Sequence, residues 1–204
     1  SVRVITRKAS YRVAKAALEL ARQRRKHMTF VHKDTVFKLG CGMFVEECRR
    51  AAAEYPDVLV DDVIVDTFAM RLVRDPQSFD VVVTTNMFGD ILSDEAAGLV
   101  GGLGMAPGLC IGEGRVAMAQ ATHGSAPDIA GRGIANPYAM IESTRMLIAW
   151  LGHDRGIEAA VAAAKAMSRA TTAALADPAA RTGDIRGAGN TRTMTEAVIK
   201  GLTQ

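Results

Sequence analysis

The sequence predicts an α/β protein in which helices cover a largely buried sheet. In the first half of the 204-residue chain, short apolar runs typical of strands alternate with segments whose apolar residues recur at helical spacing. In the second half, the stretch after residue 137 is rich in alanine and has the pattern of helix almost throughout. Such alternation predicts a layered fold, because each helix must bury its apolar stripe against the sheet.

Four runs in the first half are expected to be strands. The clearest is residues 79–85, where valines and threonines surround a single charged residue, Asp80. In residues 1–6, Val2 and Val4 fall on one side, as in a strand with one buried face. The expected strands are residues 1–6, 28–32, 58–65 and 79–85.

Helices are expected between these strands. Ser10 is placed to cap the first, in which apolar residues from Val13 to Ala21 recur at helical spacing. Asp66 leads into the third, which ends at Pro76 because the residue before a proline disfavours helix. The helices expected in this half begin at residue 10 and cover residues 42–53, 66–75 and 90–100.

Two glycine-rich stretches, residues 101–108 and 123–137, are expected to be loops. Helices are then expected over residues 138–151, 157–176 and 194–202. The change of composition near Gly101 predicts a domain boundary, with residues 1–99 in one domain and residues 100–204 in the other.

Composition favours an ordinary globular protein, with 49% hydrophobic and 23% charged residues. No apolar stretch approaches the roughly 20 residues that a membrane-spanning helix needs, and no secretory leader is recognisable. A cytoplasmic protein with no membrane partner is therefore expected. The odd number of cysteines, without C-x-x-C spacing, disfavours a disulfide framework or a zinc site, and Cys41 and Cys48 are expected to be buried in a helix.

One strongly basic run could contact phosphate groups, namely Arg22-Gln23-Arg24-Arg25-Lys26-His27. The favoured interpretation is a solvated helix end, where cations face the negative end of the helix dipole. No aromatic residues interleave the charges to stack on bases, and the net charge is only +3. No nucleic-acid partner is expected.

Asp90 and Asp94 are the strongest local signal of chemistry. They follow the strand that ends at Thr85, and their spacing of four residues places both carboxylates on one face of a helix. Hard oxygen ligands of this kind suit Mg²⁺ or Mn²⁺. From spacing alone, the alternative is that Asp90 caps the helix and Asp94 is a solvated acid of its first turn.

Two further candidates are weaker when taken alone. Lys33 follows a short apolar strand, where a desolvated lysine can serve as a base, although most such lysines are solvated strand ends. The segment from His123 to Gly131 has small residues that let a ligand approach the backbone, and the carboxylate of Asp128 could bind both hydroxyls of a ribose. It lacks the G-x-G-x-x-G fingerprint, so an ordinary surface loop is the alternative.

Taken together, these segments resemble the isocitrate/3-isopropylmalate dehydrogenase family of β-decarboxylating dehydrogenases. The resemblance runs from about Val2 to Leu202, and its motifs occur in the order found in the family. They are His32-Lys33, Val65-Asp66, residues 86–94, residues 101–108 and residues 123–137. The resemblance implies the layered isopropylmalate-dehydrogenase-like α/β fold, here without its N-terminal part.

The resemblance also implies the reaction, which is oxidation and decarboxylation of a 3-substituted malate such as isocitrate, 3-isopropylmalate, homoisocitrate or tartrate. By this resemblance Asp66, Asp90 and Asp94 bind Mg²⁺ or Mn²⁺, while Lys33, assisted by Asp66, accepts the proton of the substrate hydroxyl. Family members are homodimers with a shared active site, so Lys33 and Asp66 are expected opposite the partner's aspartates. Residues 1–99 are expected mainly in the dimerising domain.

The same resemblance implies that the adenosine of NAD lies on the loop before the long helices. Asp128 and Ile129 stand where NADP-using relatives carry basic or aromatic residues, and Gly183 stands where those relatives have a tyrosine, so NAD is expected. The residues expected to bind it are His123, Gly124, Ser125, Ala126, Pro127, Asp128, Ile129 and Asn136.

The chain departs from the family pattern in several places. An earlier half that supplies substrate-binding arginines and a tyrosine has no counterpart here, so a fragment is expected. Thr35 stands where asparagine is usual, and Gln120 where many relatives have glutamate. Alternative interpretations are a regulatory subunit without catalysis or an inactive fragment.

Overall fold

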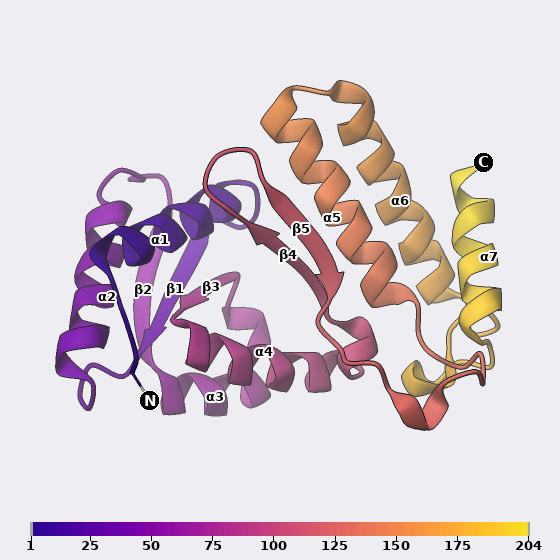
Figure 1. Ribbon diagram of the computed structural model, residues 1–204, viewed down its shortest axis with the longest axis horizontal. Coiled ribbons are helices and arrows are strands. Elements are labelled where there is room, and N and C mark those ends of the chain that lie inside the picture. Colours follow the sequence, from indigo (N-terminus) through magenta and orange to yellow (C-terminus); the bar gives the residue numbers. More distant parts are fainter. Residues whose placement is uncertain (1, 204) are drawn as a thin grey trace. The chain divides into compact units, whose positions relative to one another are not determined.

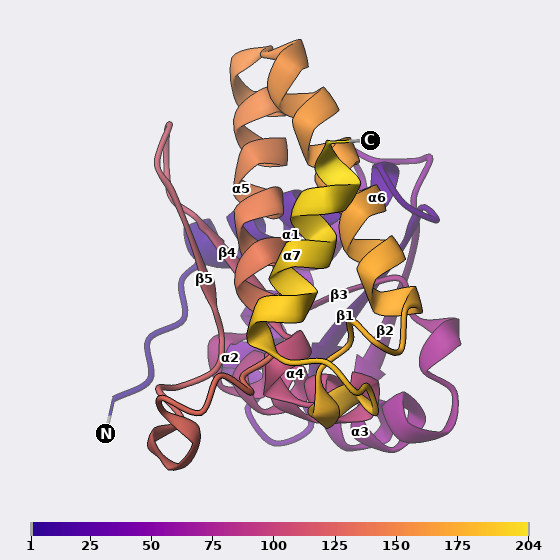
Figure 2. The ribbon, with the colours of Figure 1, turned by 90° about the vertical axis from the view of Figure 1, so that its right-hand side faces the viewer.

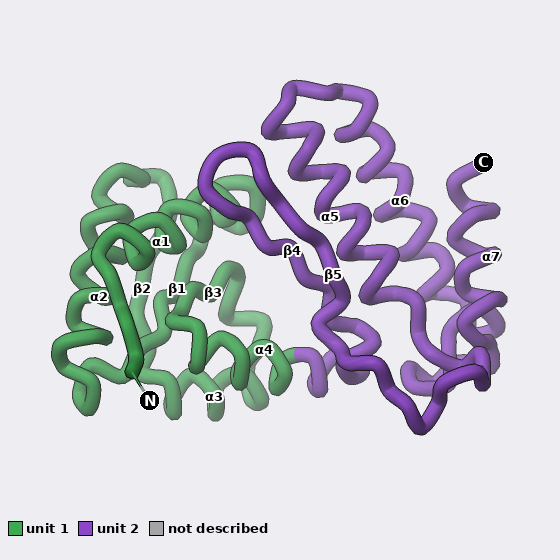
Figure 3. The backbone as a smooth tube through the Cα atoms, viewed as in Figure 1, with its two compact units in different colours: residues 1–96 green, residues 97–204 purple. Residues whose placement is uncertain are grey.

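The computed structural model describes residues 2–203 and divides into two compact units, residues 1–96 and 97–204 (Figure 3). The first unit is built around a parallel sheet with the strand order β2-β1-β3. The second combines an antiparallel hairpin with three long helices. The α/β class predicted from the sequence is confirmed.

In the first unit, each strand is followed by a helix (Figure 1). The central strand β1 is buried along almost its whole length, as expected when helices cover both faces of a parallel sheet. The elements are α1 (Arg7–Arg22), β1 (His27–His32), α2 (Lys38–Ala52), β2 (Leu59–Ile64), α3 (Val65–Arg74), the short 3₁₀ helix η1 (Pro76–Ser78), β3 (Val81–Thr84) and α4 (Asn86–Val100). The last residues of α4, from residue 97 on, belong to the second unit.

Side chains of β1 contribute to two separate cores, because successive residues of a strand face opposite sides of the sheet. Met28 and Phe30 pack in one cluster with residues of α1 and α2. Val31 packs in the other, with Phe68 of α3 and Phe88 of α4. Burying this apolar surface on both faces provides most of the driving force that holds the strand ends in place.

The first expected strand and the first expected cap are both wrong. Residues 2–6 form no strand, and Ser1 lies outside the described residues. The cap of α1 is Thr6, whose side chain accepts a hydrogen bond from the backbone N–H of Ala9 at 3.2 Å. Ser10 is instead buried inside the helix. The alternation at Val2 and Val4 was real, but no described strand pairs with this segment.

Two other helices begin earlier than expected. Helix α2 starts at Lys38 rather than at residue 42. Helix α4 starts at Asn86 rather than at residue 90, directly after β3. Asp90 therefore lies inside the helix, and the interpretation that it is the N-cap is wrong.

In the second unit, the helices α5, α6 and α7 lie side by side (Figures 1 and 2). Their contacts depend on small residues: a Cβ on Gly152 of α5 would lie 2.7 Å from a side-chain carbon of Val161 of α6. The unit contains η2 (Leu103–Met105), β4 (Pro107–Ile111), β5 (Ala117–Ala121), η3 (Pro127–Ile129), α5 (Tyr138–Arg155), α6 (Glu158–Ala176), η4 (Gly183–Ile185) and α7 (Thr191–Leu202).

The hairpin of β4 and β5 was not predicted, and part of it falls within the expected loop at residues 101–108. Ser143 of α5 fastens it. The Ser143 hydroxyl accepts a hydrogen bond from Gly108 N–H and lies 3.0 Å from the carbonyl oxygen of Gln120, and it is fully buried. Within residues 2–203, no helix is long and apolar enough to cross a bilayer.

Candidate functional site

The candidate site begins at the carboxyl edge of the parallel sheet. His32, the last residue of β1, pairs with Ile64, the last residue of β2. Lys33 follows the first and Asp66 follows the second by two residues, so both side chains start from the same edge. Ligands of open α/β sheets bind at this edge, where helix N-termini and loops converge.

Lys33 and Asp66 form an ion pair. The Nζ atom of Lys33 lies 2.5 Å from Oδ1 of Asp66. The lysine side chain is 24% exposed and the carboxylate is 67% exposed. The hydrogen bond from Lys33 lowers the pKa of Asp66, and backbone hydrogen bonds at the start of α3 act in the same direction. The ion pair thus favours the ionised form of the Asp66 carboxylate at the carboxyl edge of the sheet.

His32 directly precedes Lys33 in the chain and is buried. Its Nε2 is 3.1 Å from Oδ2 of Asp62 on β2, and its Nδ1 is 3.2 Å from Oδ1 of Asp34. The backbone N–H of Asp34 also donates to Nδ1 at 3.4 Å. Reasoning from the sequence missed this network, although the histidine precedes the lysine and acids lie on both sides of it in the fold.

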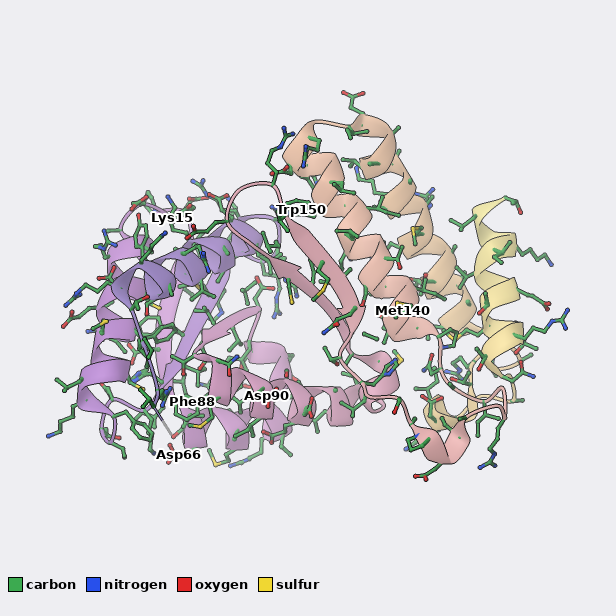
Figure 4. All side chains as sticks on the ribbon, viewed as in Figure 1. Lys15, Asp66, Phe88, Asp90, Met140 and Trp150 are labelled. Carbon is green, nitrogen blue, oxygen red and sulfur yellow. The ribbon has the colours of Figure 1, made fainter. Side chains whose placement is uncertain are left out.

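Asp90 and Asp94 extend the site along α4. Phe88 and Leu92 turn inward to the core, so the two aspartates, which are two residues further along the helix, face the opposite way and are exposed. Neither carboxylate receives a hydrogen bond or ion pair from the described residues. Figure 4 shows Asp90 on α4 and Asp66 at the start of α3, on two different helices.

The three aspartates expected to bind a metal do not form one complete ligand set. Within residues 2–203, no group of three or more histidine, cysteine, aspartate or glutamate residues could hold a metal ion. Asp90 and Asp94 suit a divalent cation because they are hard oxygen donors, unpaired and one helical turn apart. The fit is therefore good but incomplete, since a further ligand is needed.

The expected cofactor loop lies in the second unit, between β5 and α5. His123 to Asp128 are exposed, and the ring nitrogen Nδ1 of His123 lies 2.9 Å from the carbonyl oxygen of Gly124. Pro127, Asp128 and Ile129 form the 3₁₀ turn η3, which Ala126 precedes in a left-handed conformation with φ of 44°. The carboxylate of Asp128 is exposed and free to meet a ligand.

Asn136, at the end of that loop, is already bound within the protein. Its side-chain nitrogen donates to Oδ2 of Asp184 at 3.0 Å, and its oxygen accepts the backbone N–H of Tyr138 at 2.9 Å. Reasoning from the sequence missed Asp184 as the residue that holds the Asn136 side chain at the end of this loop. The available signal was a repeated Asp-Ile pair, because η4 carries Asp184-Ile185 as η3 carries Asp128-Ile129.

The basic run at residues 22–27 is paired internally, at the opposite end of β1 from Lys33. Arg22 contacts Asp57 through two nitrogens, and Arg24 donates to Asp80 at 2.9 Å. Asp80 also accepts the backbone N–H of Arg25. The run therefore follows the end of α1, as the favoured interpretation expected, but its arginines are paired with aspartates rather than solvated.

The cysteines also have structural positions. Cys41 and Cys48 are buried in α2, as predicted, and burial raises the pKa of Cys48 to about 12. A thiol so hard to ionise is a poor nucleophile and metal ligand. All three cysteines are free.

Comparison with known proteins identifies the family. The family described as isocitrate/isopropylmalate dehydrogenase matches residues 1–198. The chain belongs to the isocitrate/isopropylmalate dehydrogenase family. It is 53% identical over 154 residues to the 3-isopropylmalate dehydrogenase of Archaeoglobus fulgidus, covering 75% of this chain and 47% of that protein.

Two further family members match along nearly the whole chain. The isocitrate/homoisocitrate dehydrogenase of Thermus thermophilus is 47% identical over 200 residues, which is 98% of this chain and 57% of that protein. The crystal structure of isocitrate dehydrogenase from Methylococcus capsulatus superposes with a TM-score of 0.88 at 44% identity, over 100% of this chain and 59% of that one. The chain thus spans about half to three fifths of the length of its dehydrogenase relatives.

Proposed function

We propose that this chain carries the base and metal ligands of an NAD-dependent dehydrogenase that oxidises and decarboxylates a 3-substituted malate. The observation that carries the proposal is the Lys33–Asp66 ion pair at the carboxyl edge of the sheet, next to a helix with two unpaired aspartates. Membership of the isocitrate/isopropylmalate dehydrogenase family supports it, since the named relatives act on acids of this class.

In the proposed reaction, Lys33 accepts the proton of the substrate hydroxyl while the hydrogen on the same carbon leaves as hydride. The 2-oxo acid that results then loses its β-carboxylate as CO₂. Asp66 orients Lys33 and stabilises the ammonium that forms. When bound, NAD supplies the hydride acceptor and Mg²⁺ or Mn²⁺ supplies Lewis-acid stabilisation of the enolate charge.

Asp66, Asp90 and Asp94 are the proposed metal ligands. We infer that the active site is shared in a homodimer, with Lys33 and Asp66 of one chain facing Asp90 and Asp94 of another. The incomplete ligand set within one chain supports this arrangement, because two copies brought together would supply the missing oxygen donors.

The second unit is proposed to hold NAD. The exposed loop from His123 to Ile129 offers backbone amides to the adenosine, and Asp128 offers a carboxylate to the ribose hydroxyls. The same carboxylate would repel the 2′-phosphate of NADP. In this proposal residues 1–99 serve catalysis and dimerisation, and residues 100–204 serve cofactor binding, including Gly124, Ser125, Ala126, Pro127 and Asn136.

A Mn²⁺ titration tests the proposal without requiring turnover. Binding is monitored through the loss of the electron paramagnetic resonance signal of free Mn²⁺. The affinity for Mn²⁺ is expected to fall at least tenfold in Asp90→Asn. Glu95→Gln is the matched control, because this residue lies on the same helix beside Asp94 but is not a proposed ligand. Equal affinity in Asp90→Asn and wild type would contradict the assignment of ligands.

Absorbance of reduced cofactor, with NAD or NADP, Mn²⁺ and a panel of 3-substituted malates, tests the reaction itself. Turnover with one acid would name the substrate and show that this chain is sufficient for catalysis. A chain that binds Mn²⁺ but does not turn over needs residues beyond those present, whereas no Mn²⁺ binding at millimolar concentration favours a regulatory subunit.

A further inference from the structure

We propose that His32 is a positioning residue for Lys33, acting through a bridge from Asp62 across the imidazole ring to Asp34. The inference deepens the proposed function, because it rests on the assignment of Lys33 as the base. Lys33 directly follows His32 at the end of β1, so anything that fixes the backbone of the histidine also fixes the point from which the lysine side chain starts.

The first half of the bridge ties two strands together. His32 pairs with Ile64 in the sheet, while its ring reaches back to Asp62, two residues earlier on β2. The second oxygen of Asp62 accepts a hydrogen bond from Arg49 of α2 at 3.4 Å, so the carboxylate is held from both sides. The imidazole side chain itself is only 4% exposed. Its orientation is thus set by packing as well as by hydrogen bonding.

The second half of the bridge fixes the chain after Lys33. The Asp34 N–H donates to Nδ1 of His32, which makes Nδ1 the acceptor and leaves Nε2–H to donate to Asp62. Oδ1 of the Asp34 side chain also lies 3.2 Å from Nδ1, so both the backbone and the side chain of Asp34 are close to the ring.

Lys33 is therefore held on both sides. Its own carbonyl oxygen accepts the N–H groups of Val36 at 3.2 Å and Phe37 at 2.8 Å, which closes the turn leading into α2. The bridge and this turn restrain the backbone of Lys33. The lysine side chain is restrained separately, by the hydrogen bond from its Nζ to Asp66. Preorganisation of a base in this manner lowers the entropy lost when the reacting groups align.

A matched control lies at the other end of the same strand. His27 also faces an aspartate, with Nε2 3.2 Å from Oδ1 of Asp61, but it is far from Lys33 along β1. Two substitutions therefore separate local positioning from general loss of a histidine: His32→Ala and His27→Ala. His32→Gln is the rescue variant, because its amide N–H can replace the donor that faces Asp62.

The test is the side-chain ¹H–¹⁵N signal of the Lys33 ammonium in the whole chain, read together with hydrogen exchange at Val36 and Phe37. We expect the ammonium signal to be lost and the two amides to exchange at least tenfold faster in His32→Ala. Wild type, His27→Ala and His32→Gln should keep both. An unchanged Lys33 signal in His32→Ala, or equal losses in the two alanine variants, would overturn the proposal.

Two further readouts keep the proposal separate from the proposed function. Thermal unfolding checks whether His32→Ala remains folded. If this variant is unfolded, His32→Asn, which retains an acceptor near the position of Nδ1, takes its place in the comparison. If the chain turns over substrate, the positioning role predicts a fall in kcat with little change in KM. Absence of Mn²⁺ binding in wild type would count against the proposed function, yet the Lys33 signal would still decide the role of His32.

Discussion

Nζ of Lys33 lies 2.5 Å from Oδ1 of Asp66, although the two residues come from different strand ends. The Lys33 side chain is only 24% exposed, and the carboxylate covers one side of its amine. Lys33 should therefore react more slowly with acetic anhydride than Lys38, an exposed lysine at the start of α2. Asp66→Asn should raise the acylation rate of Lys33 several-fold and leave that of Lys38 unchanged, as measured by peptide mass spectrometry. Equal rates for both lysines in wild type would show that the ion pair does not persist in solution.

Asp90 and Asp94 should oppose stability when no metal is present. Two like charges one helical turn apart destabilise a helix by about 0.2–0.5 kcal/mol. Both are exposed and unpaired, so Asp94→Asn should raise the free energy of unfolding slightly in chelator-treated protein. Adding Mn²⁺ should then stabilise wild type more than the variant. Urea unfolding with and without Mn²⁺ measures both effects, and a loss of stability in the metal-free variant would contradict the argument.

Glu47 should be the strongest polar contact between α1 and α2. Its side chain is 4% exposed and accepts hydrogen bonds from Arg7 at 2.9 Å and Arg50 at 2.7 Å. Glu47→Ala removes both, at a cost of roughly 1–3 kcal/mol in the free energy of unfolding. Glu46 accepts from the same Arg7 but is 63% exposed, so Glu46→Ala should cost much less. Chemical denaturation of the two variants compares them directly, and equal costs would show that burial is not the deciding factor.

Asp80 should make the first unit sensitive to acid. Burial alone raises the pKa of Asp80, but hydrogen bonds from Arg24 and from the Arg25 backbone outweigh it, and the folded pKa falls below its ordinary value. A depressed pKa contributes stability that is complete above the unfolded pKa, about 4, and is lost as pH falls through the folded pKa. Asp80→Asn should therefore be less stable at pH 7 but lose less stability as the pH falls below about 4.

Unfolding of wild type and Asp80→Asn by urea at several pH values checks this. Asp75→Asn serves as the control, because the hydrogen bond that Asp75 accepts from Ser78 goes to its backbone carbonyl oxygen and not to its side chain. Parallel stability curves for wild type and Asp80→Asn across the acid range would contradict the prediction.

Gly187 should be required for the turn that presents Asp184. A Cβ at this position would lie 2.0 Å from the carbonyl oxygen of Arg181, which is backbone and cannot move alone. Gly187→Ala should cost roughly 1–3 kcal/mol or more and disturb the Asn136–Asp184 hydrogen bond. Gly183→Ala is the control, since nothing lies within 4 Å of its added carbon. Thermal unfolding and the side-chain amide signal of Asn136 give the two readouts, and a native-like Gly187→Ala would be the contrary result.

The sequence alone determined the elements whose pattern is local. Three of the four expected strands and most helices were found because β-branched runs and helical spacing of apolar residues reflect the face that each element must bury. The motifs around Lys33, Asp66 and Asp90 were also visible in the sequence, and their family membership is confirmed. Their roles as base and metal ligands remain predictions.

Only the tertiary structure decided features that depend on contacts distant in sequence. The hairpin of β4 and β5 escaped prediction because its glycine- and alanine-rich strands have little strand propensity of their own, and Ser143 of α5 holds it. Residues 2–6 have a strand-like sequence pattern but form no strand, because none of the described strands pairs with them. Likewise, nothing local pairs Lys33 with Asp66 or His32 with Asp62; parallel pairing of β1 with β2 brings each pair together.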